Sequence, residues 1–203
     1  MTSLLWVAIV VISYAFGNLN GAILISKYLM HDDVRRHGSG NAGLTNYFRT
    51  YGGFQSLLVI VIDVSKCVAA CLIARCLIPE DTLHATMAAG LSCIVGHAYP
   101  VASHFKGGKG ILCGAALAGC ADWRVLAIIL SVFILNVVCT RYVSLGSVLA
   151  ATLFAVSFLC FHWGDWMTCL IAVTAAGLVL FLHRGNLVRL FKGTESKLTF
   201  HKK

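Results

Sequence analysis

Long apolar stretches alternate with short polar segments along the chain. Seven stretches are candidates for membrane-spanning helices, since such a helix needs about 20 mostly apolar residues. They are Leu4–Met30, Phe54–Ile78, Leu83–Ala102, Ile111–Ala121, Trp123–Thr140, Val143–Trp163 and Met167–His183. The fourth is too short to span alone unless the glycine-rich stretch before it lies at membrane depth inside protein. The pattern predicts an all-α, polytopic integral membrane protein with about seven transmembrane helices.

Composition supports this class. Of 203 residues, 59% are hydrophobic and 12% are charged, whereas soluble domains carry about 25% charged residues. A soluble globule of this length could not cover so much apolar surface. We therefore expect one membrane-embedded domain over residues 1–203. The nine cysteines lie mostly in apolar runs, which indicates packing residues rather than disulfides or metal ligands.

Positive charge gathers on one predicted side. With seven alternating spans, the polar segments that share a side are Asp32–Gly53, Gly96–Gly110, Arg141 and His183–Lys203. The basic residues assigned there are Lys27, Arg35, Arg36, Arg49, Lys106, Lys109, Arg141, Arg184, Arg189, Lys192, Lys197, Lys202 and Lys203. The opposite turns hold Arg75 and Arg124. The positive-inside rule then places this side and the C-terminus in the cytoplasm and the N-terminus outside. The net charge of +8 indicates anionic lipid headgroups rather than nucleic acid.

The polar segment after the first span is rich in glycine and hydrogen-bond donors. Closely spaced glycines let backbone N–H groups turn towards an anion, and an arginine offers a planar fork to a phosphate. The segment favours a phosphate cradle leading into a short helix. The alternative is a polar connecting loop that tolerates glycine. The candidate phosphate-binding residues are Ser39, Gly40, Asn41, Thr45, Asn46 and Arg49.

A second glycine-rich segment follows the third span. Its residues are Gly96-His97-Ala98-Tyr99-Pro100 and Phe105-Lys106-Gly107-Gly108-Lys109-Gly110. The spacing is not that of a P-loop, but it places two ammonium groups on a glycine-rich turn that opens a helix. The alternative is a pair of lysines that extend to the membrane boundary. Lys106, Gly107, Gly108 and Lys109 are the candidate phosphate-binding residues here.

Two further polar pairs lie in or beside spans. His183 and Asn186, at the end of the last span, would share one face of a continuing helix. His183 is a candidate general base, a phosphate donor or an interfacial cap. Asp63 and Lys66 lie inside the second span, where a charge is costly unless it is paired or faces a cavity. We expect them to neutralise each other beside the site.

Together these motifs resemble the bacterial acyl-phosphate:glycerol-3-phosphate acyltransferase family, also called the PlsY family. The resemblance covers nearly the whole chain in order. The matching segments are Gly38–Asn41 with Thr45, Asn46 and Arg49; Gly96-His97, Pro100 and Phe105–Gly110; His183-Arg184 with Asn186; Asp63/Lys66; and the tail Gly193–Lys197. Leu44, Gly185 and Asn20 depart from it, since alanine, glutamate and proline are usual there. Gly185 removes a carboxylate beside the site.

The resemblance implies acyl transfer from a fatty acyl phosphate to the sn-1 hydroxyl of glycerol 3-phosphate, giving lysophosphatidate and phosphate in the bacterial cytoplasmic membrane. The candidate catalytic residues are His183, Ser39, Lys109 and Asn186. Neither metal nor cofactor is expected. Expected partners are the two substrates, membrane lipid and a peripheral enzyme that produces acyl phosphate.

Two other functions remain open from the sequence. Intramembrane Asp63 and Lys66 with a short fourth span would also suit a transporter or channel for a phosphorylated solute. The concentration of polar residues on one predicted side argues against a two-gated path. A non-catalytic assembly subunit is the third possibility, and it would leave the clustered donors unexplained.

Overall fold

The computed structural model describes residues 2–199, and its regular structure over that range is entirely helical. The α-helices are α1 (Thr2–Gly17), α2 (Gly21–Leu29), α3 (Leu44–Tyr51), α4 (Gln55–Leu77), α5 (Thr82–Ala98), α6 (Ile111–Ala121), α7 (Trp123–Thr140), α8 (Val143–Phe161), α9 (Trp166–Leu182) and α10 (Arg184–Phe191). Short 3-10 helices are η1 (Val34–Arg36), η2 (Pro79–Asp81) and η3 (Val101–Ser103). Lys202 and Lys203, part of the predicted cytoplasmic charge, lie outside the described residues.

The helices confirm the membrane class. Five helical stretches of the described chain are long and apolar enough to cross a bilayer, or six if α9 and α10 form one bent span. The short helix α6 has the predicted bounds of the fourth stretch, and its 11 residues are fewer than a spanning helix needs. A total of seven spans, and the side that each terminus faces, stay predictions.

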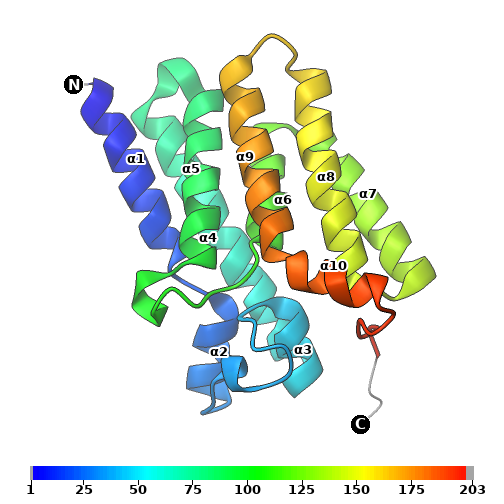
Figure 1. Ribbon diagram of the computed structural model, residues 1–203. Helices are drawn as coiled ribbons and strands as arrows, with labels where there is room; N and C mark the ends of the chain where they lie inside the picture. Colours follow the sequence, from blue (N-terminus) through cyan, green and yellow to red (C-terminus); the bar gives the residue numbers. More distant parts are fainter. Residues whose placement is uncertain (1, 200–203) are drawn as a thin grey trace. The chain divides into compact units, whose positions relative to one another are not determined.

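The helices cluster in two compact units, one running to Ala121 and the other starting at Asp122. In the first unit α1 packs on α5, and α4, α5 and α6 contact one another. Figure 1 shows α2, α3 and the segment after α5 at the same end of this unit. In the second unit α8 packs between α7 and α9. The prediction of a single domain stays a prediction.

The first apolar stretch, predicted as one span over Leu4–Met30, is one candidate span over Ser3–Leu29, and a short break in the helix divides it into α1 and α2. The side chain of Asn20 causes the second helix to start afresh, because its Oδ1 accepts the N–H of Ile23 at 3.0 Å as an N-cap. Hydropathy is high on both sides of the break, so the apolar pattern does not reveal it.

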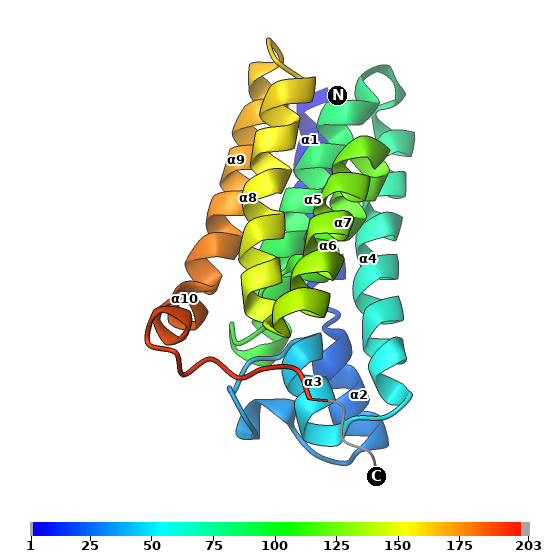
Figure 2. The same cartoon turned by 90° about the vertical axis from the view of Figure 1, so that its right-hand side faces the viewer.

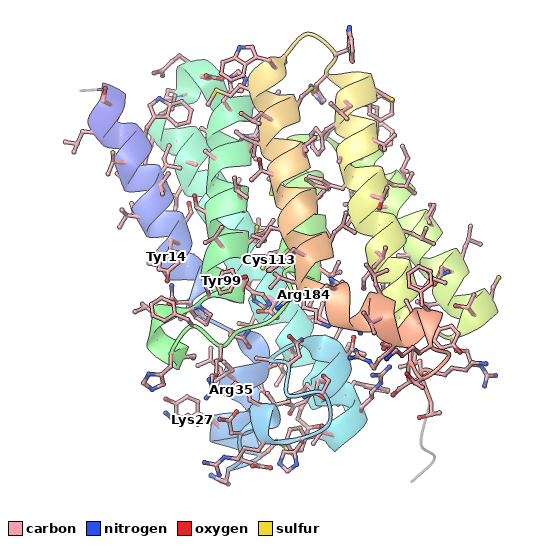
Figure 3. All side chains as sticks on the ribbon, in the orientation of Figure 1. Tyr14, Lys27, Arg35, Tyr99, Cys113 and Arg184 are labelled. Carbon is pink, nitrogen blue, oxygen red and sulfur yellow. The ribbon has the colours of Figure 1, made fainter. Side chains whose placement is uncertain are left out.

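The end of α1 lies unusually close to α5. A Cβ built on Gly17 would lie 2.7 Å from the Cα of Gly96, so neither position has room for a side chain. Small residues let helices approach in a membrane, where packing rather than the hydrophobic effect drives association. One turn earlier, the hydroxyl of Tyr14 donates to the carbonyl of Tyr99 at 2.8 Å (both labelled in Figure 3).

In the second unit the chain bends sharply after α9. The axes of α9 and α10 differ by 56°, and His183 is the residue at the junction (Figure 2). At the other end of this unit, Asp122 caps α7 through the N–H of Arg124 and also contacts Nε2 of His162, which follows α8. Hydrogen bonds from Arg124 hold the pKa of Asp122 down, at about 2.

Four buried thiols bear out the interpretation of cysteines as packing residues, whereas Cys76, Cys139 and Cys160 are exposed. Cys67, Cys71, Cys93 and Cys113 are free and buried among α4, α5 and α6. Their small apolar side chains allow these helices to pack closely.

Candidate active site

The first glycine-rich loop is shaped from within by Asn46. Its Oδ1 accepts the backbone N–H of Ser39 at 3.0 Å, and its Nδ2 donates to the carbonyls of Val34 and His37, both at 3.0 Å. The side chain belongs to α3, the short helix predicted to follow the cradle, and Asn46 is 3% exposed. Gly38 has a φ of +55° and permits the tight turn around this amide.

This bracing changes the expected role of Asn46. Both amide hydrogens are engaged by loop carbonyls, so its side chain holds the loop instead of presenting a donor to a phosphate. Ser39 is exposed on the same loop, and Asn41, Thr45 and Arg49 are half-buried. Gly40 follows Ser39 with a φ of +72°, another conformation that suits glycine.

Asp32 holds the start of the first glycine-rich loop through contacts with Tyr51 and His37. Asp32 accepts the hydroxyl of Tyr51 at 2.9 Å and contacts Nε2 of His37 at 2.6 Å. The backbone N–H of Asp33 and the Tyr51 hydroxyl hold the pKa of Asp32 below its usual value. Burial and the bond to Asp32 in turn raise the pKa of Tyr51 to about 12.

Arg35 connects the two glycine-rich segments. Its guanidinium pairs with Asp33 at 2.8 Å, and this pairing lowers the pKa of the Asp33 carboxyl. Nη1 of the same side chain donates to the carbonyls of Ser103 and Lys106 at 3.1 and 3.4 Å. Figure 3 labels Arg35 between these two parts of the first unit.

Backbone hydrogen bonds also join the two segments. The N–H of Ala42 donates to the carbonyl of Gly107 at 3.3 Å, and the carbonyl of Ala42 accepts Nδ2 of Asn20 at 2.9 Å. The N–H groups of Gly107 and Gly108 donate to the last turn of α5, at the carbonyls of Ala98 and His97. The structure therefore brings the first two predicted motifs together.

The two lysines of the second segment differ in exposure. Lys106 is exposed, whereas Lys109 is half-buried just before α6. The N-terminus of that helix follows Gly110, as predicted, and supplies the partial positive charge of a helix start. These groups could hold an anion next to the first loop.

The predicted ion pair of α4 is confirmed. Nζ of Lys66 lies 2.9 Å from Oδ1 of Asp63, and their side chains are 2% and 1% exposed. The sequence did not reveal three other contacts of this ammonium, with Nδ1 of His97 at 2.8 Å and with the carbonyls of Leu19 and Gly17 at 2.6 and 3.2 Å. The available signal in the sequence was His97 itself, a histidine within the second motif.

His183 is buried at the start of α10, with 4% of its surface exposed. Its Nδ1 lies 2.8 Å from the carbonyl of Val179. A carbonyl only accepts, so Nδ1 carries the hydrogen and, in the neutral ring, Nε2 carries the lone pair. The bend at His183 corrects the expectation of a helix continuing through His183 and Asn186.

Glu195 is a neighbour of Asn186 that the sequence reasoning overlooked. Its Oε1 accepts Nδ2 of Asn186 at 2.8 Å, and its Oε2 accepts Nε of Arg189 at 2.6 Å. Burial alone would raise the pKa of Glu195, but these hydrogen bonds outweigh it and the pKa is lowered. The tail is held further on by the N–H of Leu198, which donates to the carbonyl of Arg141 at 2.7 Å. A lone acidic residue in a basic tail was the available signal.

The fold and these segments define a class: a helical, polytopic membrane protein with two interlocked glycine-rich, basic segments suited to anions. The family model described as glycerol-3-phosphate acyltransferase matches residues 7–193. The chain therefore belongs to the glycerol-3-phosphate acyltransferase family.

Individual proteins give the same result. A glycerol-3-phosphate acyltransferase of Prochlorococcus marinus (strain MIT 9312) is 37% identical over 194 residues, covering 95% of this chain and 97% of that protein. The crystal structure of PlsY (YgiH), an integral membrane glycerol 3-phosphate acyltransferase, in its glycerol 3-phosphate form has a TM-score of 0.87 and 29% identity, covering 96% of each chain. Its lysophosphatidic acid form has a TM-score of 0.83 and 28% identity, covering 96% and 95%.

Proposed function

We propose that this protein transfers a fatty acyl group from acyl phosphate to the sn-1 hydroxyl of glycerol 3-phosphate, giving lysophosphatidate and inorganic phosphate. The observation that carries the proposal is the direct bond between the two glycine-rich segments, from Ala42 to Gly107, in a member of this family. Both substrates carry a phosphate, and the donor also carries a long apolar chain. Two basic, glycine-rich segments in a lipid-embedded protein suit both properties.

The phosphates are bound by charged and polar side chains, and glycines let the backbone come close to them. The proposed phosphate-binding side chains are Ser39, Asn41, Thr45, Arg49, Lys106, Lys109, His183 and Asn186. Gly40, Gly107 and Gly108, predicted as phosphate-binding too, are proposed to shape the two segments, because their N–H groups donate to the carbonyls of His37, Ala98 and His97. Asn46 contributes by holding the first loop in shape. Positive charge and N–H dipoles fixed before the substrates arrive stabilise the charge that develops at the transferring acyl group.

Acyl phosphate is already an activated anhydride, so direct attack by the glycerol hydroxyl is enough. The new C–O ester bond forms as the C–O bond to phosphate breaks, and phosphate leaves with the bonding electrons. Ser39, Lys109, His183 and Asn186 are the proposed catalytic residues. Holding the hydroxyl and the acyl carbon at attack distance provides most of the acceleration. This chemistry needs neither a metal nor a cofactor.

Nε2 of His183 is the proposed acceptor of the hydroxyl proton. The hydrogen bond from Nδ1 to Val179 supports this role because it leaves the lone pair on Nε2. An oxygen of the donor phosphate is the competing acceptor. Measured kcat distinguishes the two: His183→Ala and His183→Asn should both lower kcat at least about 100-fold if His183 is the base. If His183→Asn retains most of the rate, the phosphate oxygen takes the proton.

The protein is proposed to work in the bacterial cytoplasmic membrane with its glycine-rich segments facing the cytoplasm. Glycerol 3-phosphate is water-soluble, and a peripheral enzyme on the same side would supply acyl phosphate. The donor is tested by giving the purified protein glycerol 3-phosphate with either acyl phosphate or the acyl-CoA of the same chain. Lysophosphatidate should form with acyl phosphate. If lysophosphatidate forms with acyl-CoA and not with acyl phosphate, the proposed donor is wrong.

A further inference from the structure

The buried ammonium of Lys66 sits where three helices meet. It reaches the carbonyls of Gly17 and Leu19 at 3.2 and 2.6 Å, where the first span is broken between α1 and α2. Asp63, one turn earlier on α4, accepts the N–H of Gly21 at 3.1 Å at the start of α2. The pair therefore binds both ends of the break, with the cation at the carbonyl end and the carboxylate at the N–H end.

The same ammonium determines which nitrogen of His97 carries hydrogen. Nδ1 of His97 lies 2.8 Å from Nζ of Lys66 and 3.5 Å from Oδ1 of Asp63. An ammonium has only hydrogens to donate, and the carboxylate at 2.9 Å favours this charged form. A hydrogen on Nδ1 would point at another donor, so this contact favours an Nδ1 that accepts. The hydrogen of the neutral ring then sits on Nε2.

Nε2 of His97 faces the second glycine-rich segment. A Cβ built on Gly108 would collide with this nitrogen and would lie 2.7 Å from the carbonyl of Ala42. The backbone of His97 also accepts the N–H of Gly108 at 3.1 Å. The ring and the backbone carbonyl of His97 thus both lie against the Gly107–Gly108 turn. The carbonyl of Gly107 in this turn accepts the N–H of Ala42 in the first loop.

We propose that Lys66 is a positioning residue: it holds the ring of His97, as the Nε2–H tautomer, against Gly108 and so keeps the Gly107–Gly108 turn in the shape that binds the phosphate of glycerol 3-phosphate. Lys66 acts through His97 and does not itself touch substrate. This inference rests on the proposed function for its substrate. It assigns the intramembrane pair a task beyond mutual neutralisation.

The tautomer is tested without any activity measurement. Removing Lys66 alone would leave the buried carboxylate of Asp63 unpaired and could unfold the protein, so the double variant Asp63→Leu/Lys66→Met is used. Nitrogen-15 NMR of histidine-labelled protein in lipid, with the His97 signals assigned by their loss in His97→Gln, should show hydrogen on Nε2 and none on Nδ1. The double variant should lose this preference. Hydrogen on Nδ1 in the original protein, or the same tautomer in the double variant, would overturn the proposal.

The consequence for binding is tested by kinetics in the same preparations. The double variant should raise the KM for glycerol 3-phosphate about ten-fold or more, with a smaller change in kcat. Cys71→Ala is the matched control, because Cys71 is buried farther along α4 and its thiol bonds instead to the carbonyl of Thr86. It should leave both KM and the His97 signals unchanged.

The outcomes are separable. A fall in kcat at constant KM would mean that the pair only supports folding, and would reject the positioning role. Unchanged kinetics with a changed tautomer would reject it as well. If the original protein transfers no acyl group, the proposed function fails, while the NMR result still decides whether Lys66 sets the tautomer.

Discussion

At the scale of single residues, some polar side chains of the candidate site hold the shape of its loops, and Asn46 is the main example. Asn46 was predicted as a phosphate donor from its place in a glycine-rich motif, and its residue type correctly indicated a hydrogen-bonding role. The direction in which the Asn46 side chain points could not be predicted, because an asparagine beside a loop can bond either to a ligand or to the loop backbone. The structure turns it inwards.

Replacing Asn46 should therefore damage the loop before it affects chemistry. Asn46→Ala leaves the carbonyls of Val34 and His37 and the N–H of Ser39 without this partner. We expect a loss of roughly 2–3 kcal/mol in unfolding free energy and a raised KM for glycerol 3-phosphate. Thermal unfolding in detergent and steady-state kinetics measure both. Thr50→Val, which removes only a bond along α3, is the control; equal effects from the two variants would contradict the bracing role.

Glu195 offers a residue-scale prediction in pH. Its pKa is lowered in the folded protein, so its charged form stabilises the fold above the ordinary pKa of 4.5, and that contribution disappears as pH falls through the lower folded pKa. Glu195→Gln removes the charge but keeps an acceptor for Asn186. We expect it to cost about 1.5 kcal/mol at pH 7.

The cost should shrink on acidification, because the original side chain becomes neutral as well. Unfolding temperatures of the two proteins at pH 7 and at a series of pH values well below 4.5, measured side by side, check this. A constant difference across that range would show that the charge of Glu195 contributes nothing.

At the scale of elements, the spans could be predicted from hydropathy and their interruption could not. The bounds of α6 agree with the sequence because polar segments flank it on both sides. The break before α2 has apolar residues on both sides, and the groups that stabilise it, Asn20 and Lys66, come from different helices. The contact from Lys66 joins residues 47 positions apart and leaves no periodic signal in the chain.

The cap at the break can be separated from its second contact. Asn20→Ala removes both the N-cap of α2 and the donor to Ala42, and should destabilise the fold by about 1 kcal/mol for the cap alone. Asn20→Ser keeps a capping oxygen but is too short to reach Ala42. It should retain most of the stability while raising the KM for glycerol 3-phosphate. If both variants are equally unstable, the cap is not the dominant interaction.

At the scale of the whole molecule, the predicted orientation depends on the number of spans. An odd number puts the two termini on opposite sides, and the positive-inside rule then selects the cytoplasm for the basic C-terminus. A fluorescent protein fused to the C-terminus should mature and fluoresce, and alkaline phosphatase fused there should be inactive. The reverse pattern would contradict the predicted orientation.

The membrane class followed from the length of the apolar stretches and from the composition. The family followed from the residue types of the motifs and their order along the chain. Two contacts did not follow: the Lys66–His97 link and the Asn186–Glu195 link. Each joins separate parts of the sequence through a hydrogen bond whose geometry arises only in the folded chain.

The most direct test of the central claim is a product count. Purified protein in lipid vesicles receives acyl phosphate and labelled glycerol 3-phosphate, and inorganic phosphate and lysophosphatidate are measured together. We expect the two products to form in a one-to-one ratio, and neither to form without both substrates. Uptake of labelled glycerol 3-phosphate into the vesicles without lysophosphatidate would contradict the enzyme and indicate a transporter.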